Sequence, residues 1–294
     1  MKIVITGSLG HISKPLANTL VKAGHDVTVV TSNAARTNEI TALGAKAAVG
    51  KVEDVQFLAE TFKGADAVYT MVPPTWEAAN WKQHIHNIGK NYAQAVKTAG
   101  VKRVVNLSSI GAHMPEGCGP VSGLHFAEQE LNNVAGISLT HLRPGFFYYN
   151  LMANIGMIKH MNIMGGNYGE NATMVLVHPN DIAAVAAEEL QQNTGNHIRY
   201  IASDERTTND IAKVLSETIG KPGIPWINFK DEDSHNGMLQ AGLSEEVAKN
   251  YVEMGSAVAS GQMFADYQQN RPAHSATKLE QFAQEFAGAF EAAK

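Results

Sequence analysis

Two glycines near the N-terminus stand where a backbone could come close to a phosphate group. They lie in residues 6–13, which read TGSLGHIS and follow an apolar run. Gly7 allows a tight turn after a strand, and Gly10 lets a pyrophosphate reach free N–H groups at the start of a helix near Ile12. Ser13 replaces the usual third glycine and is small enough for close helix–strand packing. We predict a dinucleotide site in which the turn contributes Gly7, Leu9, Gly10, His11 and Ile12.

The end of the second expected strand bears on which dinucleotide binds. NAD-specific sites usually carry an Asp or Glu there, whose carboxylate accepts hydrogen bonds from the ribose hydroxyls. This chain has Ser32 and Asn33 at that point and Arg36 shortly after, with no acidic residue between them. Ser32 and Asn33 can donate hydrogen bonds to a 2′-phosphate and Arg36 can supply positive charge, unless Arg36 is only a solvated helix residue. We therefore predict NADPH as the cofactor, in preference to NADH.

An α/β pattern would position this turn. Short β-branched runs alternate with amphipathic stretches through the first half of the chain. Such alternation needs crossover helices and predicts a doubly wound, mostly parallel Rossmann sheet. The expected strands are residues 2–6, 26–31, 45–49, 67–71, 103–107 and 138–142. The clearest helix is expected over residues 76–99, where apolar side chains recur at spacings of three and four.

The second half is less regular and is expected to form a smaller α+β substrate region. Strands are predicted at residues 173–177 and 197–202, and helices at 180–191, 207–219, 232–241, 245–260 and 276–292. The predicted division is a dinucleotide-binding domain over residues 1–150 and a substrate-binding region over 151–294. The two are interleaved, because residues 173–202 are expected to return to the Rossmann core. The last helix carries an apolar stripe, expected to dock on the core, made of Leu279, Phe282, Phe286 and Phe290.

Composition limits the classes of function. The chain of 294 residues has a formal net charge of −5, which gives no general attraction to nucleic acid or acidic membranes. It has no long apolar run, so no membrane span is expected. Cys118 is the only cysteine, which excludes an intramolecular disulfide and fits the expected cytoplasmic location. No metal site is expected, because His84 and His86 diverge on a helix and Cys118 lies in a loop with His113.

Several segments resemble the NmrA-like group of atypical short-chain dehydrogenase/reductases. The group includes NADPH-dependent quinone reductases, plant aromatic-alcohol reductases and cofactor-sensing regulators without catalysis. The segments that carry the resemblance cover roughly the first two thirds of the chain and are residues 6–12, 64–68, 100–105, 142–147 and 177–183.

The resemblance implies a nicotinamide site at the ends of the strands that finish near Met71 and Leu107. It implies that the cofactor contacts further residues, namely Val52, Met71, Val72, Pro73, Ser108, Ser109, His125, Pro144 and Phe146. Ile110 would lie beside the nicotinamide as well. The substrate pocket would be bordered by Phe146 and by Phe147, Tyr148 and Met152.

The chain departs from the pattern of this superfamily at its catalytic pair. The expected Tyr-x-x-x-Lys motif is replaced by Val121 and His125, and Ile110 stands at the usual catalytic serine. The standard tyrosine-driven carbonyl reduction is therefore not expected. His125 is a candidate proton donor, and the alternative is that it only binds the ribose or supports the structure. Lys51 stands where the group often has an aspartate, and Asp54 is expected to cap a helix.

The function predicted from these features is NADPH-dependent reduction of a quinone or a similar conjugated carbonyl. The substrate would be small, flat and apolar, and the protein a monomer or homodimer that binds neither nucleic acid nor membrane. A quinone can take its proton from solvent or His125 after hydride arrives, so the missing tyrosine is tolerable. Two alternatives remain at this point. One is a non-enzymatic sensor of the NADPH/NADP⁺ ratio, and the other is an oxygenase- or isomerase-like member of a biosynthetic pathway.

Overall fold

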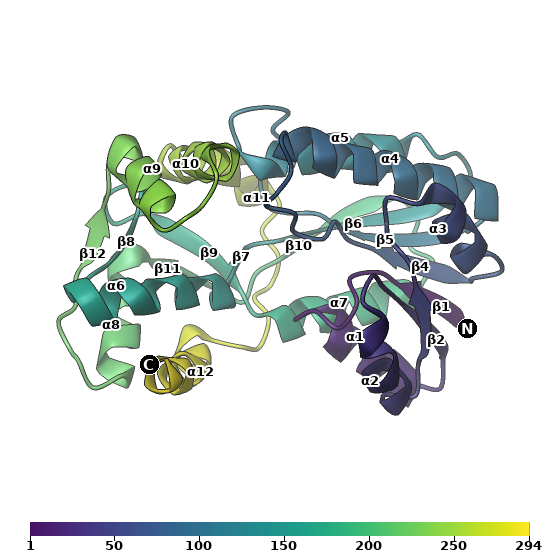
Figure 1. The fold of residues 1–294 in the computed structure, drawn as a ribbon, viewed down its shortest axis with the longest axis horizontal. Helices are drawn as coiled ribbons and strands as arrows, with labels where there is room; N and C mark the ends of the chain where they lie inside the picture. The colour runs from purple at the N-terminus through teal and green to yellow at the C-terminus, as the bar shows by residue number, and fades with distance from the viewer. Residues whose placement is uncertain (294) are drawn as a thin grey trace.

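A seven-stranded parallel sheet forms the larger part of the molecule, which we call the sheet lobe (Figure 1). The computed structural model describes residues 1–293. The strand order is β10-β6-β5-β4-β1-β2-β3, and every neighbouring pair is parallel. The strands are β1 (Lys2–Ile5), β2 (Asp26–Thr31), β3 (Lys46–Val49), β4 (Ala67–Thr70), β5 (Arg103–Leu107), β6 (Ser138–Pro144) and β10 (His197–Ile201). The predicted doubly wound α/β fold is confirmed.

Helices cover both faces of this sheet because successive strand residues alternate between them. Ile3 and Ile5 of β1 pack on the side of α1, α2 and α7, whereas Val4 packs on the side of α3, α4 and α5. Asp54 caps α3 as expected, since its carboxylate accepts the N–H of Phe57 at 3.0 Å. The helices of this lobe are α1 (Ser13–Lys22), α2 (Thr37–Ala42), α3 (Val55–Phe62), α4 (Trp81–Ala99), α5 (Pro120–Asn132) and α7 (Pro179–Leu190), with the short η1 (Ala34–Arg36).

A second lobe is built around two small sheets (Figure 1). One sheet has the order β11-β9-β7 and the other pairs β12 with β8. Its strands are β7 (Phe146–Phe147), β8 (Met164–Gly166), β9 (Thr173–Val177), β11 (Asp204–Thr207) and β12 (Trp226–Asn228). Its helices are η2 (Tyr148–Ala153), α6 (Asn154–Met161), α8 (Thr208–Thr218), α9 (Asp231–Gln240), α10 (Glu245–Ala259), η3 (Gln262–Phe264), α11 (Ala265–Gln269) and α12 (Leu279–Ala292).

The expected return of residues 173–202 to the Rossmann core needs a correction. The strand β10 pairs with β6 in the large sheet, and α7 packs beside α1. The strand β9, in contrast, pairs with β7 and β11 in the second lobe. An apolar strand can pair with the free edge of any sheet. The hydrophobicity of residues 173–177 therefore did not show which sheet β9 joins.

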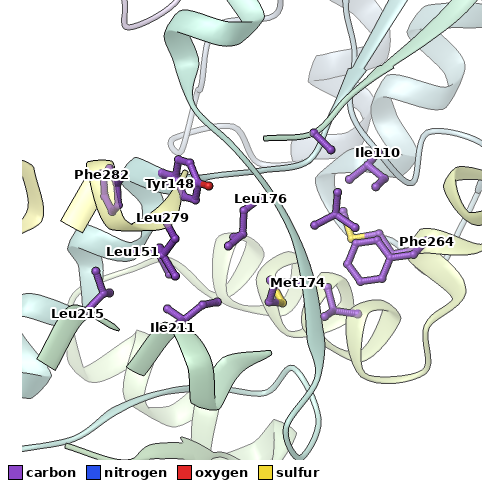
Figure 2. Packing of buried hydrophobic residues seen from close by; sticks show 14 of the residues in the cluster. Ile110, Tyr148, Leu151, Met174, Leu176, Ile211, Leu215, Phe264, Leu279 and Phe282 are labelled. Carbon is purple, nitrogen blue, oxygen red and sulfur yellow. The ribbon is translucent and has the colours of Figure 1, made fainter. Parts of the chain in front are cut away.

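The core of the second lobe is apolar and continuous across its elements (Figure 2). Met174 and Leu176 of β9 lie between the helices α8, α10 and α12. The predicted docking of the last helix is confirmed, because Leu279, Phe282 and Phe286 are buried and Phe290 packs at the edge of the same core.

A buried polar network ties the two lobes together. Arg143 of β6 pairs with Glu128 of α5 at 2.6 Å and with Asp266 of α11 at 2.9 Å. The hydroxyl of Tyr200 donates to the same Asp266 carboxylate. Removing one partner of such a buried pair leaves an uncompensated charge and destabilises the fold. The network therefore holds the two lobes together.

Most differences from the expected boundaries are small. The helix expected over residues 76–99 begins later, at Trp81, because the side chain of Asn80 caps it by accepting the N–H of Gln83 at 2.9 Å. The short strands β7, β8, β11 and β12 were not predicted, since runs of two to four residues carry too little periodicity. Among residues 1–293, no helix is long and apolar enough to cross a membrane.

Candidate cofactor and substrate site

Most of the sequence-predicted site residues lie at one edge of the large sheet. Because β1, β2, β4, β5 and β6 are parallel, their carboxyl ends all lie at this edge. The segments that follow these strands carry the candidates, and they are residues 7–12, 32–36, 71–73, 108–110 and 144–147. The edge is the usual ligand position in an open α/β sheet, so the topology brings the predicted residues together.

The glycine turn is tightly packed at Gly7. This residue has φ of +91°, and a Cβ atom there would lie 2.5 Å from Ser13 Oγ and 2.9 Å from the Met71 side chain. The Ser13 hydroxyl donates to the carbonyl oxygen of Thr6 at 2.9 Å, so it bonds the helix to the strand in place of the third glycine. A Cβ on Gly10 would come within 3.2 Å of the Gly7 carbonyl oxygen. The turn therefore requires a glycine at position 7, and a side chain at position 10 would crowd the backbone of the turn.

Arg36 is directed at the turn and is not simply solvated. Its Nη1 donates to Ser8 Oγ at 3.3 Å, and Ser8 Oγ donates to Thr31 Oγ1 at 2.8 Å. Asn33 caps η1 by accepting the N–H of Ala35 at 2.9 Å, and Ser32 is exposed. Sequence reasoning missed Ser8, which adopts φ of +54°, rare for a serine. Hydroxyl, amide and guanidinium donors thus stand together beside the turn.

Hydrogen bonds hold the segment after β4 against the turn. The N–H of Met71 donates to Thr6 Oγ1 at 2.9 Å, and its carbonyl accepts the Tyr92 hydroxyl at 2.7 Å. Leu9 packs in the same apolar cluster as Met71. Pro73 is partly exposed. The backbone of Met71 is therefore fixed by two hydrogen bonds, and its side chain packs against Gly7.

Val52 and Ile12 lie near the edge but are mostly buried. Val52 is 8% exposed and its carbonyl accepts the side-chain amide of Asn91 at 3.3 Å. Ile12 is 7% exposed and stands at the start of α1. Any contact of these two residues with a ligand would use little side-chain surface.

The segment after β5, residues 108–110, contacts both lobes. Ser108 is 4% exposed, and its hydroxyl has no hydrogen-bond partner among residues 1–293. Ser109 donates to the carbonyl of Ile110 at 2.9 Å. The expectation that Ile110 lies beside the nicotinamide is wrong, because its side chain is buried in the core of the second lobe (Figure 2). Its N–H donates to the carbonyl oxygen of Pro144 at 2.9 Å, which turns the side chain inward.

His125 lies on the face of α5 that carries Val121 and Glu128. Both neighbours are buried, Val121 beside Ile110 and Glu128 against Arg143. The Nδ1–H of His125 donates to the carbonyl oxygen of Ala112 at 2.9 Å. In the neutral ring this bond leaves Nε2 as an acceptor, and Nε2 becomes a donor only in the imidazolium form. His125 is thus oriented by its own loop, with one nitrogen left for a ligand.

The cysteine and the paired histidines show no features of a reactive site. Cys118 is fully buried, and burial raises the pKa of its thiol to about 12. His86 Nε2 contacts a carboxylate oxygen of Glu130 at 2.8 Å. Within residues 1–293, no group of three or more potential metal ligands stands together.

The aromatic residues after β6 alternate between the lobes. Phe147 packs against the cluster of Leu9 and Met71, whereas Phe146 makes an edge-to-face contact with Tyr168 at 6.1 Å. Phe147 therefore lies nearer the glycine turn than Phe146, the reverse of the order expected from the sequence. Strand alternation explains the reversal.

Tyr148 does not border the site, which corrects a second expectation. Its ring is fully buried and stacks on Phe282 of α12 with centroids 5.2 Å apart (Figure 2). Its hydroxyl donates to the carbonyl oxygen of Thr277 at 3.3 Å. Met152 packs at the edge of the same core. Tyr148 is therefore a core residue, and its ring packs against α12.

Tyr149, unlike its neighbour Tyr148, packs beside the glycine turn. Its ring stacks on His11 at 4.5 Å with an interplanar angle of 25°, and it lies 5.6 Å from Phe147. The apolar run 146–149 signalled an aromatic segment, but not which of its members faces the turn. His11, Tyr149 and Phe147 thus form an aromatic row over the glycine turn.

The helix α10 brings further second-lobe residues to this edge. Glu246 accepts the N–H of Trp81 at 2.8 Å, and Glu253 pairs with Lys82 at 2.6 Å. The two contacts fix α10 on the start of α4. As a result the ring of Tyr251 makes an edge-to-face contact with Trp81. Val72 and Leu124, the residue before His125, pack against the same cluster of Trp81, Ile85 and Val247.

Two surface hollows lie away from the strand edge. One runs between α1 and α7 beside Pro15, Asn18 and Ala183. The other lies against α9 and α10 and is lined by acidic and polar side chains that include Asp231 and Glu245. Neither hollow includes a predicted site residue. The strand edge is identified by its topology and donor groups.

Known proteins resemble this chain over most of its length. The NAD(P)H azoreductase of Xenophilus azovorans is 25% identical over 254 residues, which cover 86% of this chain and 85% of that protein. The structure of an NADPH-dependent quinone oxidoreductase from Escherichia coli, complexed with NADPH, superposes with a TM-score of 0.83. That match has 21% identity and covers 96% of this chain and 99% of that chain.

A second solved structure has the same fold. It is the triphenylmethane reductase of Citrobacter sp. complexed with NADP(H), with a TM-score of 0.80, 19% identity and coverage of 97% of this chain and 99% of that chain. The model of the NmrA-like family matches residues 1–224. That match spans most of the chain and confirms the resemblance seen in its motifs, so the protein belongs to the NmrA-like family.

Proposed function

We propose that this protein is an NADPH-dependent reductase of small, flat, conjugated acceptors such as quinones. One observation carries the proposal: the glycine turn, the Ser8–Arg36 donor group and the segments after β4 and β5 stand at one strand edge. The azoreductase, the quinone oxidoreductase and the triphenylmethane reductase that resemble the chain support the same class of reaction.

The residues present fit a dinucleotide with a 2′-phosphate. The N–H groups after Gly7 and Gly10 would hold the pyrophosphate, and Ser8, Ser32, Asn33 and Arg36 would hold the 2′-phosphate. The nicotinamide half would contact Met71, Val72, Pro73, Ser109 and Pro144. The buried Ser108 hydroxyl, which has no hydrogen-bond partner within residues 1–293, is a polar group that a bound cofactor would satisfy.

The lobes divide the work in this proposal. Residues 1–150, with β10 and α7, would bind the cofactor, and the rest of 151–294, together with Phe147 and Tyr149, would supply the substrate side. Phe147 and Tyr149 would present flat apolar surface to the acceptor. We propose a cytoplasmic location and a monomer or homodimer.

NADPH supplies a hydride to the acceptor when it is bound, and the chain supplies orientation and a proton route. Because Nδ1–H of His125 is used by Ala112, its Nε2 can act in two ways. As imidazolium it would donate a proton to the acceptor oxygen, and as neutral imidazole it would accept a hydrogen bond from a ribose hydroxyl. A quinone can also take its proton from solvent, so Val121 in place of a tyrosine does not prevent the reaction.

Oxidation of NADPH in the presence of a panel of quinones tests the proposal. We expect steady loss of the NADPH absorbance that requires both protein and quinone. Binding of NADPH without any turnover across the panel would overturn the reductase assignment. That result would favour a non-catalytic sensor, for which the replacement of the catalytic tyrosine by Val121 is the supporting observation.

A further inference from the structure

The positive charge of Arg36 has no carboxylate partner in the protein. Within residues 1–293, its guanidinium group makes one hydrogen bond, to Ser8 Oγ at 3.3 Å, and no ion pair. The side chain is exposed, and a guanidinium group carries several N–H donors, so most of them remain free for a ligand. The other arginines all pair with an Asp or Glu side chain, and they are Arg103, Arg143, Arg199, Arg206 and Arg271.

The acidic residue nearest to Arg36 in the sequence after it is already engaged. Glu39 of α2 pairs with Lys14 of α1 at 2.7 Å, and this hydrogen bond lowers the pKa of the Glu39 carboxyl. Lys14 therefore takes the carboxylate that Arg36 could otherwise use. The charge of Arg36 is left for an anion from outside the protein.

A chain of hydroxyl groups determines how Ser8 can bond Arg36. The Ser8 hydroxyl donates to Thr31 Oγ1 at 2.8 Å, and the Thr31 hydroxyl donates to the carbonyl oxygen of Asn33 at 3.4 Å. Thr31 is 2% exposed and also accepts the N–H of Asn33 at 3.2 Å. A hydroxyl has a single proton, and Ser8 uses its own toward Thr31. Ser8 Oγ can therefore accept an N–H of Arg36 but has no proton left for a phosphate oxygen.

The backbone fixes the place of the Ser8 hydroxyl. Ser8 adopts φ of +54°, a left-handed conformation that is rare for a serine. Its N–H donates to the carbonyl oxygen of Val30 at 3.0 Å, so its backbone and its side chain both bond the end of β2. Ser8 thus joins the glycine turn to the segment that carries Arg36.

We infer that Ser8 is a positioning residue for NADPH, whose hydroxyl holds the Arg36 guanidinium in place for the 2′-phosphate and makes no bond to the phosphate itself. The inference rests on the proposed function and deepens it, because it assigns the preference for NADPH to two coupled residues and not to Arg36 alone. Arg36 supplies the charge, and Ser8 fixes where that charge stands. NADH has a hydroxyl in place of the 2′-phosphate, so its binding does not depend on the pair.

Calorimetric titration with NADP⁺ and NAD⁺, which differ only in the 2′-phosphate, tests the inference. We expect Ser8→Ala to weaken NADP⁺ roughly 3- to 10-fold, the effect of one hydrogen bond, and to leave NAD⁺ unchanged. In an Arg36→Ala background, the same Ser8→Ala change should alter NADP⁺ affinity by less than about twofold, because no guanidinium is left to position.

Ser260→Ala is the matched control, since it removes an exposed hydroxyl that bonds only the carbonyl oxygen of Ala257 at 3.2 Å. It should leave both affinities unchanged. The inference is overturned if Ser8→Ala leaves NADP⁺ binding unchanged, or if it weakens NAD⁺ as much as NADP⁺. It is also overturned if the loss of NADP⁺ affinity is the same with and without Arg36, because Ser8 would then bond the phosphate itself.

Failure of the proposed function gives different results. A wild type that binds neither dinucleotide, or that does not prefer NADP⁺, would contradict the proposed cofactor and the inference with it. A wild type that fails to oxidise NADPH with any quinone would contradict only the reductase assignment. In that case, a preference for NADP⁺ that depends jointly on Ser8 and Arg36 would still support the inference.

Discussion

The strand edge and the contact of α10 with α4 are held in different ways. At the strand edge, backbone groups are fixed by nearby hydrogen bonds, such as Ser8 N–H to the Val30 carbonyl at 3.0 Å. The contact of α10 with α4 joins segments far apart in the sequence, since Glu246 and Trp81 are 165 positions apart. The cofactor side is thus encoded in local turns and the substrate side in long-range packing. Substitutions should affect the two regions differently.

The largest effect is expected at the glycine turn. Gly10→Val would place a branched side chain against the Gly7 carbonyl, where even a Cβ would lie at 3.2 Å. We expect binding of NADPH and NADH to fall by at least about 100-fold, because the pyrophosphate loses its close approach. Titration of tryptophan fluorescence measures this loss. Gly237→Val is the matched control, since nothing lies within 4 Å of a Cβ at that exposed helical position; equal losses in both variants would contradict the assignment of the turn.

Neighbouring tyrosines should separate packing from ligand contact. Tyr148→Ala removes a fully buried ring that stacks on Phe282, and we expect the free energy of unfolding to fall by about 3–5 kcal/mol. Tyr149→Ala removes a partly exposed ring and should cost less stability, but it should weaken NADPH binding. Urea unfolding followed by circular dichroism gives the stabilities. A larger stability loss at Tyr149 than at Tyr148 would show that their environments are misassigned.

The ion pairs of Glu189 should make the free energy of unfolding depend on pH in the acid range. Burial alone would raise the pKa of Glu189, but hydrogen bonds from Arg199 and Thr140 and the charge of His197 hold it at about 2. A depressed pKa contributes stability above the unfolded value of 4.5, and this contribution is lost as the pH falls from there through about 2. It amounts to about 3 kcal/mol for this side chain, which is 3% exposed.

Urea unfolding at a series of pH values measures this contribution. Between about pH 5 and pH 2, the wild type should lose more stability than a Glu189→Gln variant, which has no carboxylate to protonate. Glu188→Gln, which replaces a neighbour that is 47% exposed, is the control and should behave like the wild type. A Glu189→Gln variant with the same acid dependence as the wild type would contradict the assignment.

His125 gives a kinetic test of how the two regions meet. If the imidazolium donates a proton, His125→Ala should lower turnover by about 100-fold and leave NADPH affinity little changed. If neutral His125 holds the ribose, the same change should weaken NADPH binding and spare turnover at saturating cofactor. Stopped-flow kinetics with separate cofactor titrations distinguishes the two. A variant that changes neither quantity would remove His125 from the site.

The sequence predicts the sheet lobe better than the second lobe for a physical reason. Alternating strands and helices, the glycine turn and the Asp54 cap are local patterns, and the structure contains each of them. Ile110 and Tyr148 were misplaced because burial in the second-lobe core depends on α12 and η3, which come much later in the chain. The contact of α10 with α4 had no signal at all, since it joins segments that are far apart in the sequence.

Binding of NADPH and NADH to the wild type and to Arg36→Ala is the most direct test of the central claim, that this strand edge holds a dinucleotide with a 2′-phosphate. We expect the wild type to bind NADPH more tightly than NADH, as followed by tryptophan fluorescence. Arg36→Ala should weaken NADPH by roughly 1–3 kcal/mol through loss of a charge-assisted hydrogen bond and leave NADH unchanged. Equal affinities in the wild type, or a tighter complex with NADH, would contradict the account.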